Sequence, residues 1–222
     1  MALWRLCERV GVDVGATEGP PYRVDAAQRE AFERVLAEAR QRDGLVDLTG
    51  CPYPAHELLT YVAVEHRLLL HGSNDTALEV LEPRPARDFD TELLAVVAAD
   101  DSIWPMFYAV VARDHVEGVF TGCTHLGRPP RVRRFYLFVV FTDEQPSSWC
   151  TDGVVHALPR AGFQREWGQE WVRADPVRPV LRVPVGPADF PLRDAVLQVS
   201  PRDPSPKLIR RLRAAKRTRP RA

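Results

Sequence analysis

The feature that most constrains the fold is a change of pattern at Arg67. Two stretches before this residue, 25–43 and 54–66, have helical spacing, whereas short runs of Val, Leu, Phe and Tyr, broken by Pro and Gly, follow it. The runs predict strands near 67–71, 93–98, 132–142, 153–158, 170–174 and 179–185. One embedded helix is expected in DDSIWPMFYAVVARD, with Pro105 in its first turn. This order predicts an α+β fold with an N-terminal helical segment and a mixed or antiparallel β core.

Both early helices have an apolar face and a recognisable beginning. In the first, Phe32, Val35, Leu36 and Ala39 share one side and Asp25 is placed to cap the N-terminus. Gly44 follows where a helix end favours a left-handed residue. In the second helix, Pro54 occupies the first turn, and the core-facing residues are Leu58, Leu59 and Val62.

Composition indicates a globular protein with a strongly basic end. The chain has 222 residues, of which 45% are hydrophobic, and a formal net charge of zero. Residues 207–222 hold eight Lys or Arg and no acid, so the rest of the chain carries a net charge of −8. We expect residues 1–66 to pack as an arm and helices on a core over 67–200. Residues 201–222 are expected to form a basic, flexible and solvated tail, with weak contact to phosphates as the alternative.

Nothing in the sequence indicates export or a membrane. The longest apolar stretches, 93–99 and 135–141, are too short to cross a bilayer, and charged residues interrupt the N-terminal apolar run. The four cysteines are scattered, which favours reduced thiols in the cytoplasm. Cys123 and His125 give only two metal ligands, so no metal site is predicted.

Three segments carry residues suited to ligand chemistry. The first is His71-Gly72-Ser73, where a leucine-rich strand is expected to end. Glycine lets a backbone approach a ligand closely, and both polar side chains form hydrogen bonds, although a turn with a satisfied histidine explains the same letters. The second is Asp100-Asp101-Ser102, either a helix cap or the site of a catalytic acid. The third is Glu170, at the start of a strand after Gly168. Its carboxylate projects into a cleft or lies on the surface, as most glutamates do.

The order and approximate spacing of these segments resemble the ADP-ribosyltransferase superfamily, in the branch of poly(ADP-ribose) polymerases and rifampin ADP-ribosyltransferase. That family has a strand ending in His-Gly-Ser or His-Gly-Thr, a Tyr-Phe-Ala-Ser-Asp strand leading into a helix, and a late Asn-Glu-Tyr-x-Val before an Asp-Pro bend. The matching stretches here are LHGS (70–73), VVAAD (96–100) and QEWV (169–172) before Asp175-Pro176, within residues 67–186. The chain is also similar to a bacterial family with LLHGSN and IWPMF signatures, which implies no function by itself.

The resemblance implies an NAD-dependent glycosyltransferase. In it, His71 binds the adenosine ribose of NAD, the Gly72 backbone holds the nicotinamide carboxamide, and Ser73 contacts the nicotinamide ribose. Glu170 binds the 2′-hydroxyl of that ribose. Loss of nicotinamide leaves an oxocarbenium-like ribose, and a carboxylate stabilises the charge that develops in its transition state.

The chain departs from the family at two places. The position of the aromatic residue that stacks on nicotinamide matches Val96 and Val97, and valine cannot stack; Trp104, Tyr108 or Tyr136 are the candidates to replace it. Gly168 stands where arginine-modifying relatives have Glu or Gln, which argues against arginine as the acceptor.

Several functions fit this pattern. ADP-ribosyl transfer to a protein, a nucleic acid or a small molecule is the leading hypothesis, with NAD hydrolysis where water is the acceptor. An RNA 2′-phosphotransferase shares the fold, and Arg84, Arg87 and Arg178 are candidates for its phosphate site. The contrasting class is a non-catalytic module that binds NAD or ADP-ribose, or an interaction domain.

Overall fold

The computed structural model describes residues 16–88, 91–126, 133–143, 149–167 and 169–202. The chain forms two compact units. The larger unit comprises residues 22–112 and 149–191, and the smaller unit comprises 1–21, 113–148 and 192–222. These boundaries do not coincide with the expected ones after residues 66 and 200. Most of the expected basic tail, 203–222, lies outside the described residues.

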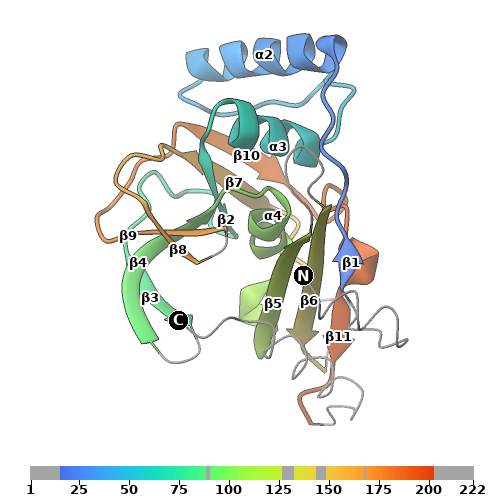
Figure 1. Cartoon of the computed structure of the whole chain (residues 1–222), viewed down its shortest axis with the longest axis vertical. Coiled ribbons are helices and arrows are strands. Elements are labelled where there is room, and N and C mark those ends of the chain that lie inside the picture. Colours follow the sequence, from blue (N-terminus) through green and yellow to red (C-terminus); the bar gives the residue numbers. More distant parts are fainter. Residues whose placement is uncertain (1–15, 89–90, 127–132, 144–148, 168, 203–222) are drawn as a thin grey trace. The chain divides into compact units, whose positions relative to one another are not determined.

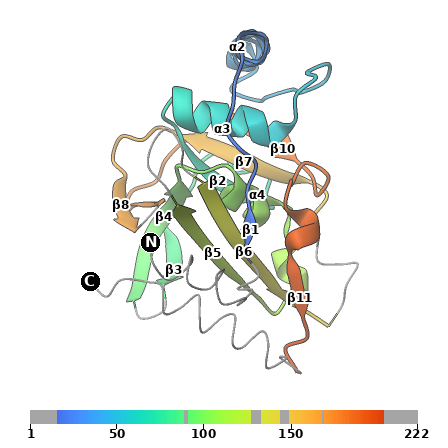
Figure 2. The same cartoon turned by 45° about the vertical axis from the view of Figure 1, so that its right-hand side comes forward.

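Two helices open the larger unit, as predicted. Helix α2 (Ala26–Gln41) begins with a reciprocal cap in which the Gln28 amide donates to Asp25 Oδ1 at 2.8 Å and the Asp25 amide donates to Gln28 Oε1 at 3.0 Å. Gly44, at φ +77°, adopts the predicted left-handed conformation. Helix α3 (Ala55–Glu65) buries its predicted face, and it lies between α2 and the sheet (Figures 1 and 2).

The larger unit is built on an antiparallel sheet. Its strands are β2 (Leu69–Ser73), β3 (Arg84–Asp88), β4 (Thr91–Ala99), β7 (Gly153–Leu158), β8 (Gln164–Trp167), β9 (Glu170–Arg173) and β10 (Leu181–Val185). The order is β10-β7-β2-β4-β9-β8, and β3 pairs with the outer half of β4. The α+β class is therefore confirmed. The strand expected near 67–71 extends further than predicted, since β2 continues through Ser73.

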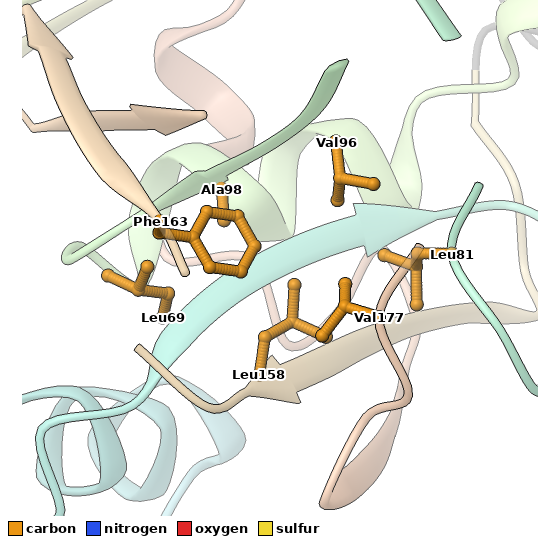
Figure 3. Packing of buried hydrophobic residues seen from close by; sticks show 7 residues of the cluster. All are labelled: Leu69, Leu81, Val96, Ala98, Leu158, Phe163 and Val177. Atoms are coloured by element: carbon orange, nitrogen blue, oxygen red, sulfur yellow. The ribbon is translucent and has the colours of Figure 1, made fainter. Parts of the chain in front are cut away.

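The two faces of this sheet are covered differently. On one face lies helix α4 (Ile103–Val110), packed against β2 and β7 (Figure 1). On the other face lies an apolar cluster that includes the Phe163 ring (Figure 3). Its members are Leu69, Leu81, Val96, Ala98, Leu158, Phe163 and Val177. Because strand side chains alternate between faces, each site residue is assigned to the α4 face or to the cluster face by its register.

The smaller unit has its own sheet. Its strands are β1 (Thr17–Glu18), β5 (Gly118–Leu126), β6 (Arg133–Phe141) and β11 (Leu197–Val199), and short 3₁₀ turns cover Arg113–His115 and Arg193–Ala195. Strand β6 confirms the strand predicted over 132–142 and pairs with the other three, in parallel only with β11. Within the described part of the chain, no helix is long and apolar enough to cross a bilayer.

Replacing Asp25 by alanine is expected to destabilise the larger unit by about 0.5–2 kcal/mol, because the substitution removes the acceptor of the α2 cap. Urea unfolding followed by circular dichroism measures the loss. Glu30→Ala, an exposed carboxylate on the same helix, is the control, with an expected change below about 0.5 kcal/mol. Equal losses in the two variants would contradict the capping role.

Candidate functional site

His71, Gly72 and Ser73 lie in the middle of the larger sheet. Strand β2 pairs with β7 along its whole length, from Leu69 opposite Leu158 to Ser73 opposite Val154. With β4, in contrast, it forms a single residue pair, Leu70 with Ala99. Beyond that pair the β2–β4 ladder stops, so the motif runs along an interruption in the sheet.

The His71 imidazole spans this interruption. Its Nδ1 lies 2.7 Å from the carbonyl oxygen of Val97 on β4. A carbonyl oxygen only accepts hydrogen bonds, so Nδ1 carries the proton and donates, and in the neutral ring Nε2 is an acceptor. The half-buried ring therefore has a fixed orientation and a fixed tautomer.

Gly72 is explained by helix packing. A Cβ at this position would overlap the carbonyl oxygen of Pro105 and lie 2.8 Å from the amide nitrogen of Ala109, both in α4. Gly153 meets the same helix, since its Cβ would overlap the carbonyl oxygen of Ala109. The two glycines let α4 approach the sheet closely, and Gly72 therefore has a structural role that requires no ligand.

The other polar residues after His71 also have local partners. Ser73 is buried, and its Oγ accepts a hydrogen bond from the Asp75 amide at 3.0 Å. The Asn74 side-chain amide donates to the carbonyl of Ala109 at 2.8 Å, near the C-terminus of α4. These contacts hold the chain as it leaves β2 and agree with the turn interpretation of the motif.

The acids after β4 are structural too. Asp101 Oδ1 accepts from the amides of Ile103 at 2.9 Å and Trp104 at 3.0 Å, which confirms the predicted helix cap. Asp100 does not cap; its Oδ2 lies 2.7 Å from Arg165 Nη2. The Ser102 hydroxyl is 2.7 Å from that of Thr60 and joins α4 to α3.

Glu170 and His71 belong to opposite faces of the sheet. Directly opposed residues in antiparallel strands point to the same face. Leu70 opposes Ala99, and Ala99 opposes Glu170, so Glu170 lies on the α4 face together with Leu70 and Gly72. His71 follows Leu70 by one residue and points to the cluster face, where its ring centroid is 6.4 Å from that of His156. The register does not bring the two predicted site residues together.

The valines and aromatic candidates are likewise separated. Val96 is buried in the apolar cluster on the face of His71, whereas Val97 lies on the α4 face with Glu170. Tyr108 and Trp104 belong to α4, and the Tyr108 ring packs edge-on against Phe107. Tyr136 belongs to the smaller unit, where it is buried and stacks on Phe138. Gly168 lies outside the described residues.

His156 was missed by the sequence analysis. It opposes His71 in β7 and is completely buried, and among the described residues neither of its ring nitrogens has a hydrogen-bond partner. Burial lowers the pKa of this imidazole to about 4, and the nearby His71 and Arg182 act in the same direction. Only the pairing of β7 with β2 brings the two histidines together, and no local sequence signal predicts it.

No family model, curated protein or solved structure matches the chain. In the described segments, no group of three or more His, Cys, Asp or Glu residues could hold a metal ion.

Gly72→Ala is expected to destabilise the larger unit by roughly 1–3 kcal/mol or more, because the new methyl group overlaps the backbone of α4. Thermal and urea unfolding measure the change. Gly122→Ala is the control, since its Cβ would meet Leu137 at an ordinary 3.9 Å. A Gly72→Ala protein as stable as the control would contradict the close packing of α4.

Stability should also fall in acid because of His156. Its folded-state pKa of about 4 lies below the ordinary 6.5, so between these values the unfolded chain binds a proton that the folded chain does not. As the pH falls through this window, the free energy of unfolding decreases by at most about 1.4 kcal/mol per pH unit. In His156→Leu this slope should be absent, and an unchanged pH profile would contradict the assignment.

Proposed function

We propose that the larger unit has an ADP-ribosyltransferase-like core that binds NAD or ADP-ribose at His71 without transferring ADP-ribose. The supporting observation is the fixed orientation of the His71 ring at the interruption between β2 and β4. With Nδ1 donating to Val97, Nε2 of the neutral ring has the character of an acceptor, and a ribose hydroxyl is a chemically matching donor. The identity of the ligand is inferred from the resemblance of the LHGS stretch to the family motif.

The absence of transfer is proposed from the sheet register. A carboxylate stabilises an oxocarbenium-like ribose only when it lies beside the charge that develops. Glu170 and His71 point to opposite faces of one sheet, so a dinucleotide held against the His71 face is out of reach of the Glu170 carboxylate. Val97 on the α4 face also offers no ring to stack on nicotinamide.

The geometry favours RNA 2′-phosphotransfer less. Arg84 is exposed on β3, and Arg178 is exposed with its Nη1 4.0 Å from Glu79 Oε2. The Arg87 side chain lies outside the described part of the structure. No contact recorded among the described residues joins Arg84 or Arg178 to His71.

Equilibrium binding and turnover of labelled NAD test this proposal together. We expect saturable binding of ADP-ribose and NAD that weakens about three- to tenfold in His71→Ala, because one neutral hydrogen bond contributes about 0.5–1.5 kcal/mol. Glu170→Gln should bind like the wild type, and so should His115→Ala, which removes an exposed histidine of the smaller unit.

Two results would overturn the proposal. Release of free nicotinamide that disappears in Glu170→Gln would establish catalysis through this carboxylate. A lack of saturable binding of either ligand would remove the binding function itself.

A further inference from the structure

Two arginines stack on Trp171, and a third lies on the same face of the larger sheet. The guanidinium carbon of Arg160 lies 4.4 Å from the centroid of the Trp171 ring, and that of Arg165 lies 5.2 Å from it. Arg165 opposes Trp171 across the β8–β9 ladder, and Arg160 follows β7 in a turn. Arg173 is two residues beyond Trp171 and shares its face. We call Arg160, Arg165, Arg173 and Trp171 the arginine cluster.

Backbone and side-chain contacts hold these guanidiniums in place. Arg165 Nη2 donates to Asp100 Oδ2 at 2.7 Å, and Arg160 Nε donates to the carbonyl of Arg67 at 3.3 Å. Arg173 Nη1 donates to the carbonyl of Ala161 at 3.0 Å. Guanidiniums stacked on an aromatic ring and fixed in this way lose little freedom when they bind an anion.

The arginine cluster carries more positive charge than its neighbours neutralise. Asp100 is the one carboxylate that pairs with these arginines among the described residues; besides its contact with Arg165, it lies 4.0 Å from Arg160 Nη2. Glu170 points to the opposite face. The side chains are accessible, since that of Arg165 is 54% exposed and that of Arg160 is 30% exposed.

Two buried donors in the arginine cluster lack acceptors. In the described part of the chain, neither Trp171 Nε1 nor Arg173 Nε has a hydrogen-bond partner. Buried polar atoms are nearly always paired, so each exception requires a reason. Both groups only donate, as do the guanidinium edges around them, and the matching ligand is one that only accepts.

We propose that the arginine cluster is a binding site for phosphate groups, either of a free nucleotide or of a nucleic-acid strand. Arginine presents a planar fork of donors that fits phosphate oxygens in pairs, and a phosphate group accepts without donating. Three guanidiniums against one carboxylate favour a ligand with more than one negative charge. The proposal does not depend on the proposed ribose contact of His71.

Binding of a fluorescent 12-nucleotide single strand to the full chain, followed by anisotropy, tests the proposal. Arg160→Ala/Arg165→Ala should weaken binding at least tenfold and lower the slope of log affinity against log salt by about 1–2. The matched control, Arg23→Ala/Arg34→Ala, removes two exposed arginines of the same unit and should change affinity less than twofold. Since the basic end of the chain is common to both variants, its contribution cancels.

Two further measurements identify the source of the phosphate and separate a loss of binding from a loss of folding. Displacement of the strand by inorganic pyrophosphate or ADP indicates a free nucleotide, whereas resistance to both indicates a strand; each outcome supports the proposal. Arg165→Lys keeps the charge but loses the planar fork, and should still weaken binding at least threefold. Equal binding by the two double variants, wild-type affinity in Arg165→Lys, or equal competition by polyglutamate would overturn it.

Discussion

The close approach of helix α4 to the larger sheet determines how the whole candidate site is arranged. Neither Gly72 nor Gly153 has room for a Cβ beneath this helix. Ten residues or fewer of chain connect β4 to the part of α4 that packs on Gly72, and the Asp101 cap fixes where the helix begins. With α4 on one face, the neighbours of Gly72 in β2 must point to the other, and there the β2–β7 register places His71 opposite His156.

This constraint changes the meaning of the His-Gly-Ser motif. From the sequence alone, the tripeptide suggests a ligand-binding site in which the glycine backbone approaches a dinucleotide. In the structure the glycine is needed by α4 and the serine closes a turn, and the imidazole is held by its contact with the Val97 carbonyl. The alternation of the same strand separates that imidazole from Glu170. The order of such segments along a chain therefore does not determine whether their side chains meet.

The sequence predicted the elements well where the determining forces are local. The apolar face and cap of α2, the left-handed Gly44 and the Asp101 cap involve residues only a few positions apart. Strands β1, β3, β5, β8 and β11 were missed; in β5, Gly, Thr and Cys dilute the apolar pattern. The pairing between strands could not be predicted from the sequence. The pairs Leu70–Ala99 and Ala99–Glu170 bring together positions up to a hundred residues apart. The same holds for His156 and for the arginines around Trp171.

A crystal structure of the full chain with bound NAD or ADP-ribose tests the central claim most directly. The account predicts a ligand whose ribose hydroxyl lies within hydrogen-bond distance of His71 Nε2, on the cluster face, with the Glu170 carboxylate directed to the α4 face and away from the ligand. A single dinucleotide in contact with both His71 and Glu170 would contradict it.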